Sequence, residues 1–162
     1  MARPVMPRRP TMPDWLTVQR ACTAFELPAD ADFAGWLQAA FTACGRGGEL
    51  TLRIVDAEEG RQLNRDYRGR DRPTNVLAFP LTPPAPLTAA YLGDLALCAP
   101  VVAQEAALQA KLPRAHWAHL TVHGALHLLG YDHEEPEAAA HMEQMERVVL
   151  ASCGFDDPYE DE

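Results

Sequence analysis

The sequence predicts a mixed α/β (α+β) fold, in which a small mixed β-sheet packs against helices. Segments with the two-residue alternation of strands interleave with segments of helical periodicity, which is typical of this class. Hydrophobic residues make up 48% of the 162 residues, enough for a core, and this excludes global disorder. We expect one domain spanning 1–162, with a flexible basic leader (1–14) and an acidic tail (156–162) as peripheral ends.

The first predicted elements are a strand and a helix. Residues 15–25 mix apolar and polar side chains in near alternation, which indicates a strand. Asp30 then introduces a helix whose apolar side chains recur at helical spacing between Phe33 and Phe41. The glycine-rich run 45–48 ends this helix.

A second strand and helix follow directly. Residues 50–55 alternate cleanly between apolar and polar side chains, as a strand with one buried face does. Asp56 is a suitable N-cap for a helix through about Tyr67. Glu59 stands three residues after Asp56, which is the spacing of a capping box.

Prolines mark the middle of the chain. Residues 73–80 are expected to form a strand bounded by prolines, and a proline-rich loop follows at 81–88. The apolar run 91–98 predicts the fourth strand. Residues 101–111 then show helical periodicity and stop ahead of a proline.

The last part of the chain predicts two helices. Residues 114–129 form a long helical pattern that ends at Gly130, a residue suited to the left-handed conformation after a helix. After a short turn, 137–150 is amphipathic and ends near Gly154. The order of the strands in the sheet does not follow from these patterns.

Charge and composition predict a cytoplasmic protein with no membrane partner. The net charge is −9, and five of the acidic residues lie in 156–162, whereas 61–75 holds five arginines against two aspartates. Such a chain is a poor non-specific binder of nucleic acid, although its basic stretch can hold phosphates. No apolar run approaches the roughly 18 residues of a membrane span. The four cysteines are widely spaced, which argues against a disulfide framework or a zinc–thiolate site.

Three histidines have the spacing of a metal site. His123 and His127 are four residues apart and therefore share one helical face. Gly130 lets the chain turn so that His133 can return beside them. Three imidazoles leave one coordination position open for water, as a catalytic zinc site requires. We therefore expect one metal ion at His123, His127 and His133, either zinc or another divalent first-row metal.

The residue after the first of these histidines argues against a peptidase. In the zinc-protease motif H-E-x-x-H-x-x-G-x-x-H, a glutamate at this position serves as general base. Here the position is Gly124, so a protease on that plan would lack its base.

Other polar residues near the three histidines are expected to support the metal site or to lie outside it. His119 shares the face of His123, and we expect it to lie in the pocket around the metal without binding it, because a fourth ligand would close the site. Asp132 either orients a ligating imidazole or caps the turn. His116 and His141 are expected to be surface residues.

The basic segment is a candidate phosphate site. Arg68, Arg70 and Arg72 follow one another at two-residue spacing, and a guanidinium near a metal can hold a phosphodiester through its bidentate fork. Each arginine could equally belong to a solvated loop. Thr74 and Asn75, just ahead of an apolar strand, indicate a hydrogen-bonded loop.

Two long motifs resemble those of the YbeY family, the bacterial endoribonucleases of ribosomal RNA maturation. They are N-x-x-Y-R-G-R-D-x-P-T-N-V-L-A-F-P at 64–80 and H-G-A-L-H-L-L-G-Y-D-H at 123–133. The run L-G-D-L-A-L at 92–97 and the Glu-Ala step at Glu105 fit the same family. The likeness covers nearly all of the chain beyond about residue 15.

The resemblance implies a function and assigns roles to residues. It implies single-strand-specific, zinc-dependent RNA cleavage in maturation of the small-subunit 16S rRNA 3′ end and in ribosome quality control. Its metal ligands match His123, His127 and His133, and its functionally important arginine matches Arg68. We expect Arg68 to bind the phosphate in the transition state, with Arg70, Thr74 and Asn75 as further substrate contacts. The fold it implies is a small mixed sheet with helices and the metal in a cleft.

Partners and alternatives follow from these expectations. The expected partners are ribosomal RNA, the ribosome or its small subunit, and proteins that present the substrate, because an acidic chain attracts free RNA poorly. One alternative is a non-catalytic rRNA-binding assembly factor with a structural metal. Another is a metallohydrolase of a different substrate. The general base is open: metal-bound hydroxide, the substrate 2′-hydroxyl as attacking group, or an acid outside the motif.

Overall fold

The computed structural model describes residues 12–81 and 91–159, which form a four-stranded sheet with five helices. The strands are β1 (Leu16–Arg20), β2 (Glu49–Val55), β3 (Val76–Pro80) and β4 (Tyr91–Cys98). The helices are α1 (Asp30–Cys44), α2 (Ala57–Arg68), α3 (Ala99–Leu108), α4 (Pro113–Leu128) and α5 (Pro136–Ser152). The predicted fold class is therefore confirmed. Most of the predicted proline-rich loop, and the leader through residue 11, lie outside the described residues.

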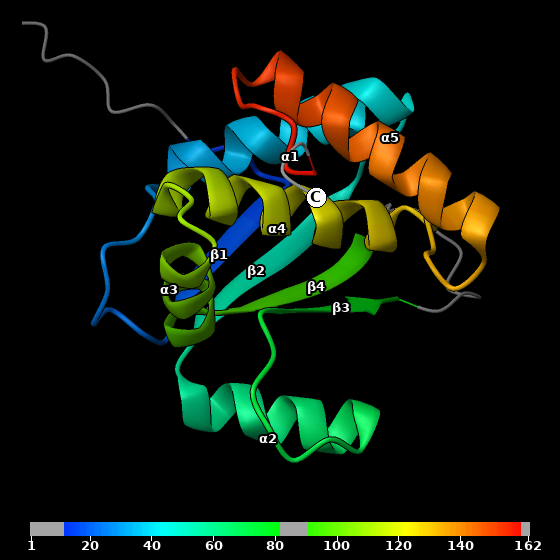
Figure 1. The fold of residues 1–162 in the computed structure, drawn as a ribbon. Helices are drawn as coiled ribbons and strands as arrows, with labels where there is room; N and C mark the ends of the chain where they lie inside the picture. Colours follow the sequence, from blue (N-terminus) through cyan, green and yellow to red (C-terminus); the bar gives the residue numbers. More distant parts are fainter. Residues whose placement is uncertain (1–11, 82–90, 160–162) are drawn as a thin grey trace, which may run out of the picture.

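The sheet is mixed, with strand order β1-β2-β4-β3. Strands β1, β2 and β4 run parallel, and β3 pairs antiparallel with β4 at one edge. Helix α2 lies on one side of the sheet, whereas α1, α4 and α5 lie on the other (Figure 1). The core fills the space between the sheet and these three helices, and its largest fully buried members include Phe33, Leu52 and Leu126.

The first strand, Leu16–Arg20, is shorter than the predicted 15–25, because the chain turns away from the sheet after Arg20. After Arg20, the backbone N–H groups of both Ala21 and Cys22 donate to the carbonyl of Ile54. The Arg20 guanidinium bonds the carboxylate of Asp30 at 2.6 Å, which fastens this turn to the start of α1. The strand therefore ends where side-chain and backbone bonds redirect the chain, a feature that alternation alone does not reveal.

Helix α2 starts at the predicted cap, but with half of the predicted capping box. The Asp56 side chain accepts a hydrogen bond from the backbone N–H of Glu59 at 2.9 Å, as expected. The Glu59 carboxylate does not return to the cap. It pairs instead with the Arg53 guanidinium of β2, with a 3.0 Å bond to Nη2. This pair raises the pKa of Arg53 and fixes the N-terminal half of α2 over the sheet.

The ends of the chain are less peripheral than expected. Met12, at the end of the predicted leader, packs against the core. In the predicted acidic tail, Asp157 pairs with Arg147 of α5 at 3.1 Å, and the carbonyl of Pro158 accepts a bond from Lys111. Asp157 and Pro158 of the predicted tail are therefore held against the body of the protein. Among the described residues, no helix has the length and apolar character needed to cross a membrane.

Helix α4 packs closely against the sheet at Gly124. A Cβ atom at this position would lie 2.7 Å from Leu95 Cδ2 and 3.3 Å from Val76 Cγ2, and both neighbours are buried. Glycine therefore allows this close approach, and any larger side chain would force the end of the Leu95 side chain to move within the packed core. A glutamate at this position would meet the same two side chains.

Gly124→Ala is expected to lower the free energy of unfolding by about 1 kcal/mol, because overpacking of the helix–sheet contact, which typically costs about 1–3 kcal/mol, outweighs the roughly 1 kcal/mol that alanine gains from helix propensity. Urea denaturation of the wild type and the variant measures this difference. The matched control is Gly35→Ala in α1, where nothing lies within 4 Å of the new Cβ and helix propensity favours alanine. Equal stability of the wild type and Gly124→Ala would mean that the contact is looser than the structure shows.

Candidate metal centre and arginine cavity

Three histidine side chains converge where α4 ends. His123 and His127 lie one turn apart on α4, and their Nε2 atoms are 3.1 Å apart. Gly130 adopts φ +98° after the helix, as expected, and the chain returns to place His133 beside them. One ligand atom from each of the three imidazoles lies within 4.8 Å of the others. The structure therefore brings together the three residues predicted as ligands.

The geometry and charge of this cluster suit a divalent metal. Two imidazole nitrogens bound at about 2.0–2.1 Å to one tetrahedral ion are separated by roughly 3.3 Å, close to the distance between the two Nε2 atoms. Burial, with His123 and His133 nearby, lowers the pKa of His127 to about 4. His127 is therefore neutral at neutral pH, as a metal ligand must be.

The other ring nitrogens of the two helical histidines are used for orientation. The Nδ1 of His127 is 3.1 Å from the backbone carbonyl of Tyr131, to which it can donate. The Nδ1 of His123 bonds the carboxylate of Glu146 from α5. With hydrogens on Nδ1, both rings present a bare Nε2 to the same point, which is the tautomer that binds a metal.

Glu146 is a functional residue that the sequence analysis missed. Its carboxylate is fully buried in the core, where acidic side chains are rare. Burial alone would raise the pKa of Glu146, but the nearby His119 imidazole, the hydrogen bond from His123 and the hydrogen bond from the Tyr159 hydroxyl lower it to about 2. The carboxylate is therefore ionised and fully engaged. The signal in the sequence is a glutamate on the buried face of α5, between Met142 and Val149.

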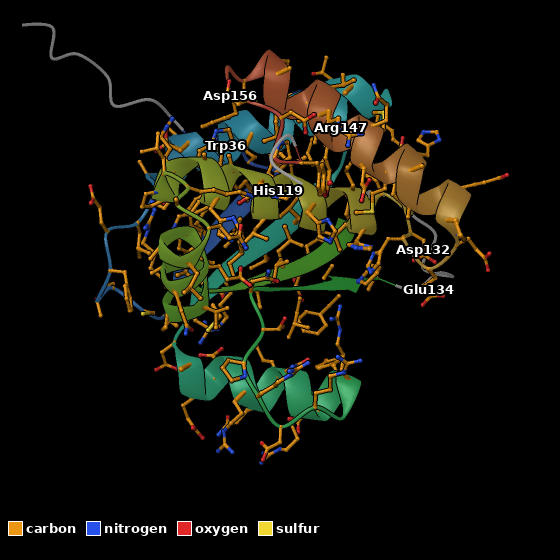
Figure 2. The ribbon with its side chains drawn as sticks, viewed as in Figure 1. Trp36, His119, Asp132, Glu134, Arg147 and Asp156 are labelled. Atoms are coloured by element: carbon orange, nitrogen blue, oxygen red, sulfur yellow. The ribbon has the colours of Figure 1, made fainter. Side chains whose placement is uncertain are left out.

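His119 and Asp132 have different surroundings. His119 Nε2 is 3.6 Å from the Glu146 carboxylate and 3.3 Å from the Tyr159 hydroxyl, so it lies beside the metal cluster and outside it. Asp132 accepts bonds from the backbone N–H groups of His133 and Glu134, at 2.7 and 3.2 Å. Of its two predicted roles, the structure shows the turn cap. Figure 2 shows Asp132 and Glu134 together in the loop after α4, away from His119.

The expectation that His116 is a surface residue is wrong. Helix α3 packs against the first turns of α4 and leaves His116 only 4% exposed. Its Nε2 lies 2.9 Å from the Glu105 carboxylate of α3, and burial lowers the pKa of His116 despite that acid. His141 is exposed, as expected.

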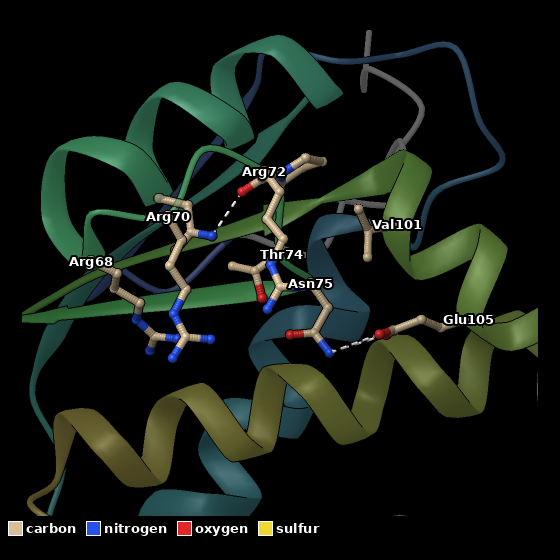
Figure 3. Close-up of a pocket in the computed structure, with 9 residues that line it drawn as sticks. Arg68, Arg70, Arg72, Thr74, Asn75, Val101 and Glu105 are labelled. Carbon is tan, nitrogen blue, oxygen red and sulfur yellow. Dashed lines mark hydrogen bonds between the residues drawn. The ribbon is translucent and has the colours of Figure 1, made fainter.

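A second feature is a cavity of about 240 Å³ between the end of α2, the following loop and α3. Its lining residues are Asn64, Arg68, Arg70, Arg72, Pro73, Thr74, Asn75, Val101 and Glu105. Figure 3 shows the guanidinium groups of Arg68 and Arg70 side by side, both pointing toward α4. Among the described residues, no carboxylate forms an ion pair with Arg68, Arg70 or Arg72, so their charges are available to an anion.

The loop that carries these arginines is fixed by two asparagines. Asn64 of α2 is buried and donates to the carbonyl of Arg72 at 2.7 Å. Asn75 donates to Glu105 at 3.0 Å, and its side-chain oxygen accepts from the backbone N–H of Val76 at 2.6 Å. The Asn75 amide is therefore committed to holding the loop. Thr74 is half-buried in the cavity wall.

Comparisons with known proteins identify the family and agree with this architecture. A family model described as "Endoribonuclease YbeY" matches residues 23–154. A Halorhodospira halophila protein of that name is 64% identical over 129 residues, which are 78% of this chain and 84% of that protein. A Stenotrophomonas maltophilia protein of the same name is 54% identical over 137 residues, 82% of this chain and 85% of that one. The solution structure of a Thermotoga maritima protein superimposes with a TM-score of 0.56, and the match covers 90% of this chain and 99% of that protein. Because the two sequences are only 21% identical, this likeness supports the fold and not the function.

Proposed function

The chain belongs to the YbeY family of endoribonucleases, and on that basis we propose that it cleaves single-stranded RNA in a metal-dependent reaction. The observation that carries the proposal is the convergence of three histidine ligands, two of them on α4, together with an arginine cavity whose guanidinium groups point toward the same helix. We further propose that residues 1–162 act as one cytoplasmic domain. Its substrate would be ribosomal RNA, at the 3′ end of the small-subunit RNA, in maturation and ribosome quality control.

We assign the metal to His123, His127 and His133, with one zinc ion as the proposed cofactor. A divalent ion held there supplies Lewis-acid chemistry, because it polarises a phosphoryl oxygen and lowers the pKa of a coordinated water. The chain's own contribution is orientation: Glu146 and the carbonyl of Tyr131 hold two of the rings. Fixed ligands cost no reorganisation when the reaction occurs.

Arg68 is proposed to bind the phosphate that is cleaved. Its guanidinium points from the end of α2 toward α4, and no described carboxylate neutralises it. A guanidinium forms two parallel hydrogen bonds to a phosphate and gains strength as negative charge develops in the transition state. Arg70 lies beside it and would hold the same or the next phosphate. Gly124 has no side chain, so no proton acceptor acts from that position.

The net charge of −9 favours a substrate presented by a larger assembly. We propose the ribosome or its small subunit, with its bound proteins, as that partner. A positively charged protein surface attracts free RNA. The net negative charge of this chain repels RNA everywhere except near the arginine cavity. An alternative role as a non-catalytic RNA-binding factor is not favoured, because relatives that match most of the chain are named as endoribonucleases.

Arg68→Ala is expected to lower kcat/KM for cleavage of a single-stranded RNA about a hundredfold, because it removes one transition-state contact. The assay uses metal-loaded protein, a labelled single-stranded oligonucleotide and the same sequence in a duplex. Chelation should abolish cleavage, and adding zinc back should restore it.

The matched control is Arg65→Ala, since Arg65 lies one turn earlier on α2, pairs with Asp66 and does not line the cavity. Its kcat/KM should stay near that of the wild type. Cleavage that survives chelation, or that is equal for duplex and single strand, would contradict the proposed function.

A further inference from the structure

The arginine cavity contains an acid. Among the described residues that line it, Glu105 is the acidic one, and its side chain is 30% exposed. Figure 3 shows Glu105 on α3, on the other side of Asn75 from Arg68 and Arg70. A carboxylate repels phosphate, so this end of the cavity suits a different group of the bound ligand.

The Glu105 carboxylate is held in one orientation, with part of its acceptor capacity unused. Its Oε1 accepts from His116 Nε2 at 2.9 Å and from Asn75 Nδ2 at 3.0 Å. Its Oε2 has only a longer contact of 3.3 Å, to the same Asn75 nitrogen. Because each carboxylate oxygen can accept two hydrogen bonds, Oε2 can still accept one from a ligand.

The composition of the cavity identifies the ligand group. None of the lining residues that the structure describes is aromatic, so they offer no ring on which a nucleobase would stack. Its polar wall, with cations at one end and an acceptor at the other, matches the sugar–phosphate backbone. The phosphate is an anion for the arginines, and the ribose hydroxyl is a donor for the carboxylate. Acidic side chains bind ribose hydroxyls in the same way in dinucleotide-binding folds.

We propose that Glu105 accepts a hydrogen bond from a ribose 2′-hydroxyl of the RNA strand whose phosphates bind Arg68 and Arg70. This inference rests on the proposed function. The 2′-hydroxyl is the group by which a protein distinguishes RNA from DNA at a given site. Glu105 is therefore a specificity-determining residue that selects RNA.

The position of Glu105 separates this contact from the cleavage chemistry. It is bonded to His116, which lies seven residues before His123 on α4, a rise of about 10 Å along the helix. The 2′-hydroxyl that Glu105 binds thus belongs to a nucleotide next to the cleavage site. Asn75, predicted as a substrate contact, thus acts on the substrate through Glu105, because its amide holds the Glu105 carboxylate in place.

The test is a series of RNA oligonucleotides in which one ribose at a time carries 2′-hydrogen or 2′-fluorine. A 2′-fluorine keeps the ribose-like sugar shape but cannot donate a hydrogen bond. With the metal-loaded wild type, both replacements should lower kcat/KM about tenfold or more at one position away from the cleaved linkage, because a bond to a charged acceptor is lost. If 2′-fluorine is tolerated at every such position, the proposal is wrong, whatever any variant does.

Glu105→Gln then assigns the contact. Oε1 of the new amide still accepts from His116 and Asn75, which leaves the NH₂ group, a donor, where Oε2 was. The penalty at the sensitive position should shrink several-fold in this variant, because the NH₂ group can only donate a neutral hydrogen bond to the 2′-oxygen. Glu59→Gln, on the other side of the sheet, is the control and should keep the full penalty. An equal penalty in wild type and Glu105→Gln overturns the proposal. A wild type that cleaves no RNA overturns the proposed function itself, which distinguishes the two failures.

Discussion

Replacing His127 by alanine is expected to remove the bound metal and to lower the rate of RNA cleavage roughly a thousandfold. His127 supplies one of three converging ligand atoms, and two imidazoles hold a divalent ion far more weakly than three. The side chain is half-buried at the end of α4, so the fold should survive. Metal content by mass spectrometry and cleavage of a single-stranded RNA measure the two effects.

His141→Ala is the matched control for this experiment. It is the same substitution at an exposed histidine of α5 that is outside the metal cluster. Metal content and cleavage rate should both stay at wild-type values. A folded, metal-free His127→Ala protein that cleaves as fast as the wild type would show that the chemistry is elsewhere or that another nuclease is present.

Replacing Glu146 by glutamine is expected to weaken metal binding by about 10- to 100-fold. The carboxylate orients His123 and favours its Nδ1–H tautomer, and it holds the Tyr159 hydroxyl at the same time. Glutamine has the same shape but no charge, so it can no longer accept bonds with both of its terminal atoms. Competition with a chromophoric zinc chelator gives the change in Kd directly.

Two further variants serve as comparisons for the metal affinity of Glu146→Gln. Glu137→Gln changes an exposed acid in the first turn of α5 and should leave the metal Kd unchanged. Tyr159→Phe removes one hydrogen bond to Glu146 and should have an effect between the other two. If Glu146→Gln lowers the melting temperature but leaves the metal Kd at the wild-type value, Glu146 serves the fold alone.

The parts of the site that the sequence predicts are those formed by neighbouring residues. His123, His127 and His133 lie on one helix and the turn that follows it, so helical periodicity and the conformation of Gly130 were enough to bring them together. The Asp56 cap was predictable for the same reason, because its bond reaches only three residues along the chain. Local geometry determines such contacts before tertiary packing does.

The parts that the sequence did not predict depend on which helices pack together. Glu146 reaches His123 from another helix, and His116 is buried because α3 covers it. Both facts depend on the strand order and on the layer above the sheet, which periodicity does not contain. The Glu59 side chain was misassigned for a similar reason, since Arg53 of the neighbouring strand offers a stronger partner than the cap.

The contact between Glu146 and His123 also makes metal binding and the docking of α5 two coupled equilibria. Thermodynamic reciprocity requires that whatever free energy the α5 carboxylate adds to metal binding, the metal returns as stability of the α5 contact. Local opening of the C-terminal helix would therefore be rarer in a loaded molecule than in a metal-free one. The contact that orients His123 thus makes the stability of the docked C-terminal helix depend on the concentration of metal.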